Sequence, residues 1–239
     1  MVDSERRFFF LHVMRTGGTT FVWHLMANFG PQRVFPAPED NPETHESVTS
    51  IDYLRSVPRA RWDELPVVTG HFPYFVLELL PYHYETLTIL REPVARTLSF
   101  LRQWQHAPGK WLGAPLDVIY DEPAIVPHYQ NHMTKLFGLP SGCDAPHYAV
   151  DVDIDAEFTA RARANLDSID VVGLTEDHDA FLDEVVERYG WRRPSMPDQH
   201  VTERSELPAG FIERIREDNA ADIDFYDYAV DLVARRAVS

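Results

Sequence analysis

Short, nearly unbroken apolar runs alternate along the chain with longer segments in which apolar residues recur at helical spacing. A short apolar run without polar alternation is typical of a strand that is buried on both faces of a parallel sheet. A period of three to four residues predicts an amphipathic helix. The expected strands are residues 8–13, 67–69, 86–90 and 169–174, and the expected helices are residues 19–28, 51–57, 94–106, 126–138, 156–166, 177–189 and 209–235. This alternation predicts an α/β fold with helices flanking a central, mainly parallel sheet.

Segments rich in proline, glycine or acidic residues separate these elements. Such segments are typical of surface loops and irregular insertions. They cover residues 31–50, 107–127, 139–155 and 192–208. A length of 239 residues suits one α/β domain, so residues 1–239 are expected to form a single domain.

The chain is strongly acidic, with 22 basic and 38 acidic residues and a formal net charge of −16. A surface of this sign repels nucleic acid and anionic membranes, so neither is an expected partner. A small anionic ligand still fits if the fold provides a local basic pocket. The single cysteine, Cys143, forms no internal disulfide, and the apolar run near the N-terminus is too short to span a membrane. We therefore expect a cytoplasmic protein.

The first candidate site follows the first expected strand, where residues 15–20 read RTGGTT. Ligands of open α/β sheets bind beyond the carboxyl ends of the strands. The two glycines allow the backbone to curl with its amides inward, and the following helix adds its first amides and its positive dipole end. Arg15 adds a permanent charge, and Thr19 and Thr20 add hydroxyl donors. The stretch predicts a phosphate- or sulfate-binding, P-loop-like turn, although a plain strand-to-helix turn remains the structural alternative.

This turn is not a Walker A loop, in which a lysine and a hydroxyl residue follow the last glycine. Its basic residue precedes the glycines, which argues against a nucleoside triphosphatase. A kinase-like phosphoryl transferase is disfavoured for the same reason, and because no magnesium-binding carboxylate is evident in the sequence.

The second candidate site follows the third expected strand, in the stretch LREPVARTLSF. Arg91 lies where this strand leaves the sheet, and Ser99 lies eight residues further on, inside the next helix. Together they can hold a second anion. Two anion sites on one parallel sheet suggest a nucleotide with phosphates at both ends of its ribose.

The paired motifs resemble those of the sulfotransferase superfamily, whose members use 3′-phosphoadenosine 5′-phosphosulfate (PAPS). The stretches VVTGHFPY, YQNHMTKLFG, DVVGLTEDHDAFLDEV and NAADIDFYDYA resemble the branch that includes heparan sulfate 2-O-sulfotransferase and bacterial homologues. The resemblance runs from Phe8 to Leu232 and is weak over residues 31–60 and 107–127.

The resemblance implies a nucleotide-binding transferase and assigns roles to particular residues. The first loop would bind the 5′-phosphosulfate, and Arg91 and Ser99 would bind the 3′-phosphate. A basic loop near the C-terminus closes over the nucleotide in relatives, which makes Arg204 a candidate contact. The expected PAPS-binding residues are therefore Arg15, Thr16, Gly17, Gly18, Thr19, Thr20, Arg91, Ser99 and Arg204.

Arg15 departs from the motif of the family that the sequence resembles, because many members have lysine at this position. Others, such as the tyrosylprotein sulfotransferases, have arginine. An arginine hardly deprotonates, so we expect Arg15 to stabilise charge on the transferring group and the leaving phosphate rather than to donate a proton. No metal is expected, because arginine and backbone amides can carry the charge and no metal-ligand spacing is evident.

His71 is the candidate general base that takes the proton of an acceptor hydroxyl. It follows the second expected strand, its unperturbed pKa suits the task, and relatives of the 2-O branch carry a Gly-His pair here whose histidine acts as base. Glu78 and Glu92 are weaker alternatives, and Glu92 is better placed to cap its helix. His12 lies within the first strand and is expected to be structural.

The acceptor stays open among a carbohydrate, a glycolipid and a small metabolite, although the acidic surface disfavours a polyanionic glycan. Aromatic residues near loops are candidates for its pocket, namely Phe72, Tyr74, Trp104, Trp111 and Tyr129. The competing hypothesis is a nucleotide- or anion-binding module of the same fold without transfer activity. The sequence does not indicate the oligomeric state.

Overall fold

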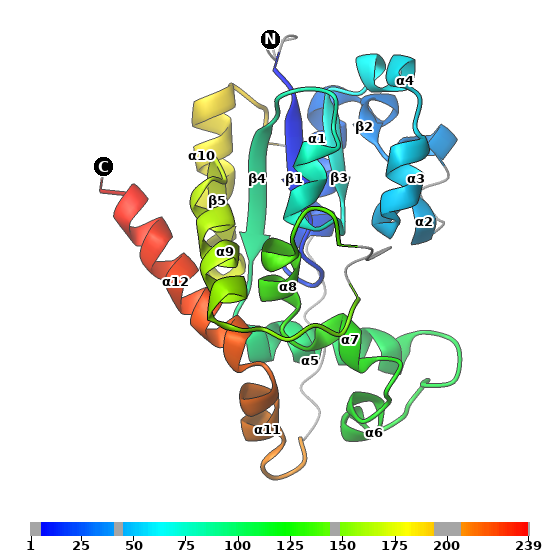
Figure 1. Ribbon diagram of the computed structural model, residues 1–239, viewed down its shortest axis with the longest axis vertical. Helices are drawn as coiled ribbons and strands as arrows, with labels where there is room; N and C mark the ends of the chain where they lie inside the picture. The colour runs from blue at the N-terminus through cyan, green and yellow to red at the C-terminus, as the bar shows by residue number, and fades with distance from the viewer. Residues whose placement is uncertain (1–5, 41–44, 144–148, 194–206, 239) are drawn as a thin grey trace.

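A computed structural model describes residues 6–40, 45–143, 149–193 and 207–238, and it confirms the α/β fold (Figure 1). The sheet contains five strands, all parallel, in the order β2-β3-β1-β4-β5. The strands are β1 (Phe8–Leu11), β2 (Val34–Phe35), β3 (Val67–Gly70), β4 (Glu85–Leu90) and β5 (Val171–Leu174).

The central strand β1 carries the most apolar run of the chain because helices cover both faces of the sheet. Phe8 and Phe10 pack on one face, and Phe9 and Leu11 pack on the other. The first face is covered by α1 (Gly18–Phe29) and α10 (His178–Tyr189). The second face is covered by α8 (His132–Gly138), α9 (Ala156–Asp167) and α12 (Ala220–Arg236), with α3 (Ile51–Ser56) and α4 (Arg59–Glu64) beside them.

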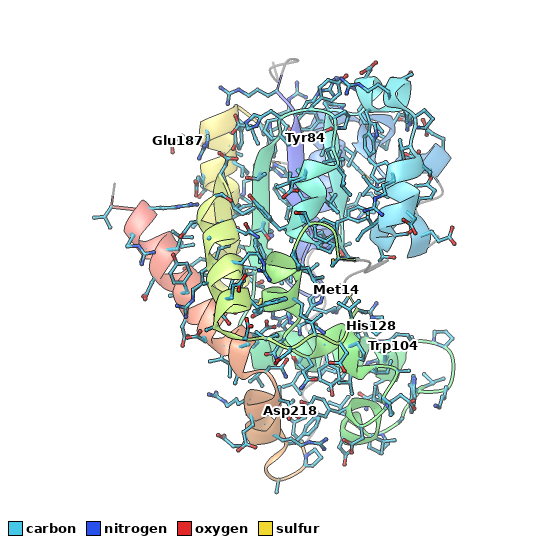
Figure 2. The ribbon with its side chains drawn as sticks, in the orientation of Figure 1. Met14, Tyr84, Trp104, His128, Glu187 and Asp218 are labelled. Carbon is cyan, nitrogen blue, oxygen red and sulfur yellow. The ribbon has the colours of Figure 1, made fainter. Side chains whose placement is uncertain are left out.

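A third apolar cluster lies below the carboxyl ends of the strands, toward which the arrow of β4 points in Figure 1. It is formed by α5 (Pro93–His106), α6 (Leu116–Tyr120), α7 (Val126–Tyr129) and α11 (Phe211–Asp218). Figure 2 labels a residue at each end of the strands: Tyr84 lies at the amino ends, just before β4, and Met14 lies at the carboxyl ends, after β1. The remaining elements are α2 (His45–Thr49) and the 3-10 turns Pro31–Arg33, Pro38–Asp40, Tyr74–Glu78 and Thr175–Asp177.

Two predicted helices are each divided in the structure, and an asparagine causes each break. Residues 126–138 form α7 and α8, which are separated at Asn131, whose φ is 47°. Residues 209–235 were predicted as one helix, but Asn219 separates α11 from α12. Asparagine tolerates non-helical backbone because its side chain hydrogen-bonds locally. The residues at the two breaks are also hydrogen-bonded to each other, since the backbone amide of Asn131 donates to Asn219 Oδ1 at 2.9 Å.

Two segments predicted to be irregular contain regular elements. Strand β2 and helix α2 lie within residues 31–50, and α6 lies within residues 107–127. Each of these elements is at most five residues long. Such short elements carry too little periodicity to be recognised among prolines, so their prediction as loops was wrong. None of the helices in the described ranges is both long and apolar enough to cross a membrane.

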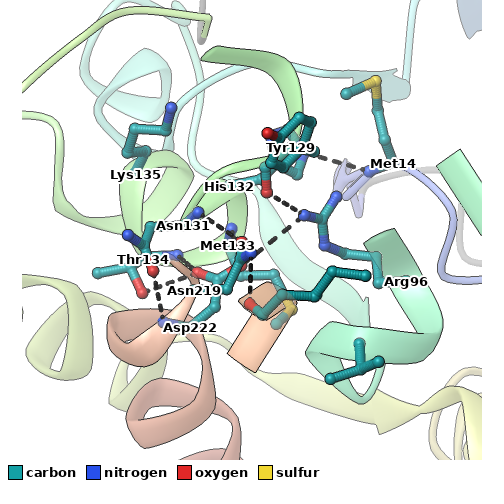
Figure 3. Close-up of polar contacts among 12 residues, drawn as sticks. Met14, Arg96, Tyr129, Asn131, His132, Met133, Thr134, Lys135, Asn219 and Asp222 are labelled. Carbon is teal, nitrogen blue, oxygen red and sulfur yellow. Dashed lines mark hydrogen bonds and ion pairs between the residues drawn. The ribbon is translucent and has the colours of Figure 1, made fainter. Parts of the chain in front are cut away.

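A buried polar network joins α5, α8 and α12 on the second face of the sheet (Figure 3). Asp222 of α12 accepts hydrogen bonds from the backbone amides of Met133 and Thr134, at 3.1 and 2.7 Å. The Arg96 guanidinium lies 4.0 Å from Asp222 and donates to Tyr129 O, and both charged side chains are fully buried. The network fixes the start of α8.

Candidate functional site

The loop after β1 occupies the centre of the carboxyl edge because β1 pairs with β3 on one side and β4 on the other. The residues that follow these three strands therefore meet at one edge. Hydroxyl side chains fasten the loop: Thr88 donates to Leu11 O at 2.9 Å, and Thr175 donates to Thr16 O at 2.8 Å. Behind the loop, the Met14 amide donates to Nε2 of the buried His132, at 3.4 Å (Figure 3).

Arg15 adopts a left-handed backbone conformation, with φ of 68°. This conformation is strained for a non-glycine residue and persists only where the surroundings hold it. The Arg91 side chain helps to stabilise this backbone conformation, because its Nη1 donates a hydrogen bond to Arg15 O at 3.1 Å. The Arg15 guanidinium then reaches α5, where Nε donates to Ser99 Oγ at 3.1 Å and Nη1 donates to Gln103 Oε1 at 3.4 Å. Arg15, Arg91 and Ser99 are thus direct neighbours.

The arginines lie in a partly buried, positively charged environment. Burial lowers the pKa of Arg15, and the charge of Arg91 lowers it further. Burial also lowers the pKa of Arg91, against the opposing attraction of Glu176 and Glu92. An arginine remains protonated at neutral pH under such shifts. The neighbouring positive charges of Arg15 and Arg91 favour an anion at this edge.

A pocket of about 380 Å³ opens beside Arg15. Its lining includes Arg15, Ser99 and Arg102, together with Gln103 and His106 of α5. Nε of Arg102 is buried and has no hydrogen-bond partner in the described part of the chain. A buried donor of this kind is satisfied when an anion enters. The donor set of the pocket therefore fits a phosphate.

The carboxylates near Arg91 are engaged elsewhere. Glu92 accepts from the amides of Val94 and Ala95, at 3.1 and 2.7 Å, and so caps the start of α5. This bears out the prediction that Glu92 caps its helix. Glu176 accepts from the Tyr226 hydroxyl at 2.7 Å and from the Glu92 amide at 3.3 Å. These bonds hold both carboxylates in fixed positions, away from the lining of the 380 Å³ pocket.

The two glycines of the loop serve different purposes. Gly17 has φ of 84°, a conformation that favours glycine, and it forms the N-cap of α1. Gly18 allows close approach, because a Cβ added there would lie 2.2 Å from Cδ2 of His12. The first amides of a helix have no acceptor within it, so the backbone at Gly18 and Thr19 is available to an anion.

His71 lies on the other side of the loop, after β3. Its Nδ1 lies 2.7 Å from His12 O, and its backbone amide donates to Val48 O at 2.7 Å. A carbonyl oxygen can only accept, so Nδ1 carries the proton and Nε2 of the neutral ring carries the lone pair. The His71 and His12 rings are 4.5 Å apart. Burial lowers the pKa of His12 well below its usual range, and the charges of His71 and Arg15 add to this effect. His12 is therefore a neutral supporting group.

A second pocket, of about 300 Å³, lies on this side of the loop. His71 and Thr19 line it together with residues of α1, β2 and β3. The glycine loop therefore separates a basic pocket beside α5 from a pocket that contains the candidate base.

The structure brings most of the predicted site residues together. Arg15, Arg91, Ser99 and His71 lie at one edge of the sheet, around the glycine loop. The Thr16 side chain instead supports the turn, since it is buried and donates to Val13 O at 2.9 Å. Thr19 is exposed, and Thr20 is half-buried with its amide bonded to Gly17 O. Arg204 lies outside the described residues.

Sequence reasoning missed three residues at this edge. Arg102 is one turn beyond Ser99 on the same face of α5, a spacing of three that signals a shared pocket. Thr175 follows β5 and bridges Thr16 O and Leu90 O. The buried Nε2 of His178, the first residue of α10, lies beside Gly17 and has no hydrogen-bond partner among the described residues. Thr175 and His178 could have been found from their position after a predicted strand.

The aromatic residues predicted for an acceptor pocket lie elsewhere. Phe72 and Tyr129 are core residues, and the Tyr129 hydroxyl donates to Tyr120 O. Trp104 and Trp111 belong to the helices and loop below the sheet, where Figure 2 labels Trp104 beside His128. Tyr74 packs against Phe137 on the second face of the sheet. The lining residues of the 380 and 300 Å³ pockets include none of the five predicted aromatics.

Comparison of the chain with protein-family models finds no match, and comparison with curated proteins finds no significant match. The function is therefore inferred from the residues and their geometry.

Proposed function

We propose that this protein is a sulfotransferase of P-loop-like fold, which transfers a sulfuryl group from PAPS to a hydroxyl group of an acceptor. PAPS supplies the activated sulfuryl group. Residues of the chain bind and orient PAPS and the acceptor, and they deprotonate the acceptor hydroxyl. The resemblance of RTGGTT and REPVARTLS to sulfotransferase motifs supports this proposal. A cytoplasmic location and a single domain belong to the same proposal.

One observation carries the proposal: two distant anion-binding motifs converge. Arg15 bonds to Ser99 across 84 residues of sequence, and Arg91 bonds to Arg15 across 76 residues. Each motif alone is a common turn after a strand. Residues of both motifs, Arg15 and Ser99, line one pocket with Arg102, whose buried Nε has no hydrogen-bond partner among the described residues, and Arg91 lies directly behind Arg15. This convergence supports a ligand with more than one anionic group.

The residues divide the work of in-line transfer between them. Arg91, Ser99 and Arg102 hold the 3′-phosphate side of the nucleotide, and the amides after Gly17 hold the 5′ side. Arg15 stabilises negative charge on the leaving phosphate. His71 receives the acceptor proton at Nε2, while its Nδ1–H bond to His12 O keeps the ring in the required tautomer. No metal is invoked, and no cluster of three or more His, Cys, Asp or Glu residues that could hold one occurs in the described ranges.

The test of donor binding is calorimetric titration with 3′-phosphoadenosine 5′-phosphate (PAP). The wild type should bind PAP, and Arg91→Ala should weaken binding by about a hundredfold, because it removes a partly buried charged donor worth ~2–3 kcal/mol. Arg55→Ala is the matched control, since Arg55 is an exposed arginine that forms a surface ion pair with Asp52 in the same helix. Absence of PAP binding by the wild type would refute the proposal.

The test of catalysis separates an enzyme from a binding module of the same fold. The wild type should hydrolyse PAPS slowly or transfer its sulfuryl group to surrogate acceptors. His71→Ala should abolish transfer to a hydroxyl while PAP affinity is retained, because His71 lies on the other side of the loop from the basic pocket. PAP binding without any turnover would instead favour the binding module.

A further inference from the structure

The pocket of about 300 Å³ beside His71 carries an inference about the acceptor. We propose that this pocket is the acceptor site and that it takes a compact, uncharged alcohol or phenol with a second hydrogen-bonding group. The inference rests on the proposed sulfotransferase function, because it uses His71 as the base for the reacting hydroxyl. It narrows the acceptor from any hydroxyl compound to a defined chemical class.

The lining of this pocket selects against charged acceptors. No Asp, Glu, Lys or Arg side chain belongs to the lining that the described residues provide. His12 is neutral, because burial lowers its pKa. An anionic or sulfated glycan would lose its hydration here without gaining a cationic partner, which is unfavourable. Five apolar side chains dominate the lining instead: Val22, Met26, Val34, Pro36 and Val48.

Thr69 supplies the evidence for a polar group on the acceptor. Its side chain is 4% exposed and lines the pocket, yet Oγ1 is buried with no hydrogen-bond partner among the residues that the structure describes. A buried hydroxyl without a partner is unfavourable, and native structures rarely keep one unless a ligand or water satisfies it. An acceptor with a second polar group satisfies Thr69 Oγ1 when it binds.

Thr69 and His71 set the distance between the two polar groups of the acceptor. Thr69 lies in β3 and His71 follows Gly70, the last residue of that strand, and both residues line the pocket. At about 3.3 Å per residue, their Cα atoms are roughly 6–7 Å apart. One ring spans this distance. A pocket of about 300 Å³ is also at the small end of ligand sites, so it suits one or two rings rather than a polymer.

The chemical step is balanced by groups already placed at the site. The acceptor oxygen forms a bond to sulfur, and the bond between sulfur and the bridging oxygen of the 5′-phosphate breaks. The hydroxyl proton passes to Nε2 of His71, and the leaving phosphate keeps the electron pair. Thr19 lines the same pocket and lies in the first turn of α1, whose amides hold the phosphosulfate in the proposed function, so the reacting hydroxyl lies between Thr19 and His71.

The experiment compares hydroquinone with phenol, two acceptors that differ only in the second hydroxyl. Transfer from PAPS should be faster for hydroquinone, with kcat/KM at least about tenfold higher, because only hydroquinone satisfies Thr69. A sulfated heparan oligosaccharide should not be an acceptor. Thr69→Val removes the hydroxyl and keeps the shape of the side chain. It should lower kcat/KM for hydroquinone to the value for phenol and leave phenol unchanged.

A second variant tests the location of the pocket without relying on Thr69. Val22→Trp places a large side chain in the pocket from a half-buried position on α1, and it should lower transfer to both acceptors by about a hundredfold or more by excluding them. Ala27→Trp is the matched control, because Ala27 is an exposed residue of the same helix and does not line the pocket. PAP titration of each variant verifies that the fold and the donor site are intact.

The outcomes separate failure of this inference from failure of the proposed function. If PAP binds and Arg91→Ala weakens it, but transfer occurs only to the sulfated oligosaccharide, the acceptor inference is wrong and the transferase stands. The same conclusion follows if Val22→Trp transfers to phenols as fast as the wild type does, or if Thr69→Val leaves the preference for hydroquinone unchanged. If the wild type binds no PAP, the proposed function and this inference both fall.

Discussion

Gly18 illustrates how one missing side chain organises the site at the scale of single residues. The His12 ring occupies the space where a Cβ at this position would lie, with Cδ2 only 2.2 Å away. The same ring is 5.3 Å from the Phe10 ring and 4.5 Å from the His71 ring, and His12 O accepts the bond that fixes the His71 tautomer. A change at Gly18 is therefore transmitted to the candidate base.

Gly18→Ala should disturb both stability and ligand binding. The added methyl must displace His12, and overpacking of this kind costs about 1–3 kcal/mol. We expect a fall of this size in the free energy of unfolding in urea, together with weaker PAP binding by calorimetry.

Gly30→Ala, at the other end of α1, separates steric overlap from backbone strain. Gly30 has φ of 87° and ψ of 142°, a conformation that favours glycine, but nothing lies within 4 Å of an added Cβ, so the substitution should cost about 1–3 kcal/mol through backbone strain alone. PAP affinity should be unchanged. If Gly18→Ala bound PAP as tightly as the wild type does, this result would show that His12 does not hold the loop in its binding conformation.

The residues found from sequence were those whose role follows from their place in the chain. Arg15, His71 and Arg91 each come shortly after an apolar run, and the end of a buried strand is recognisable from that run. Arg102 and Thr69 escaped notice, because a serine-arginine spacing on a helix or a threonine in a strand is ordinary. Only packing shows that Arg102 Nε and Thr69 Oγ1 are buried without partners in the described chain.

At the scale of elements, α8 depends on a side chain from the far end of the chain. It has seven residues, fewer than an isolated helix needs to be stable in water. Asp222 of α12 accepts hydrogen bonds from two backbone amides at the start of α8, and from the Thr134 hydroxyl at 2.9 Å. Burial raises the pKa of Asp222, against the opposing charge of Arg96 and these hydrogen bonds. Asp222 is also the acidic partner of the buried Arg96, at 4.0 Å.

Asp222→Ala should be severely destabilising. Removing one member of a buried ion pair leaves the other charge uncompensated, and the expected loss is about 3–5 kcal/mol in the free energy of unfolding. The control is Asp224→Ala in the same helix, which removes a surface pair with Arg163 and should cost less than about 1 kcal/mol. Equal effects in denaturant titrations would contradict a special role of Asp222 at the start of α8.

The elements that sequence reasoning placed well are long helices or strands rich in apolar and β-branched residues. β1, β3, β4 and β5 lie within or close to their expected ranges, because such residues are typical of buried strands. β2 has two residues, so its apolar run is too short to detect. The breaks at Asn131 and Asn219 follow from contacts between segments 88 residues apart, which local pattern cannot reveal.

The whole molecule combines a net charge of −16 with a positively charged pocket. It also buries imidazoles that must stay uncharged. Burial lowers the pKa of His24 to about 4, lowers that of His178, and holds those of His12 and His132 well below the usual range. In each case burial is the largest cause and neighbouring positive charge adds to it, although Asp179 opposes the lowering of the His178 pKa.

Stability should therefore decrease as the pH falls from 7 toward 5. The unfolded chain takes up protons at these four histidines near their ordinary pKa of about 6.5, whereas the folded chain does not, so protonation favours the unfolded state. The stabilisation is complete above about pH 7 and is lost progressively below it. Urea unfolding midpoints at pH 7.5 and 5.5 test this expectation.

His24→Gln provides the comparison for this pH dependence. With one of the four groups removed, the difference between the two midpoints should shrink. A midpoint that is constant or rises on acidification of the wild type would show that the buried histidines are not the dominant titrating groups in this interval.

The bond from the Met14 amide to His132 has a consequence for the order in which the protein is made. The glycine loop leaves the ribosome long before Asp222, which holds the start of α8 behind the loop. Because synthesis proceeds from the N-terminus, the loop has no rear support until α12 has also been made. Nascent chains that stop before α12 would carry the anion-binding motif without the means to hold it in shape.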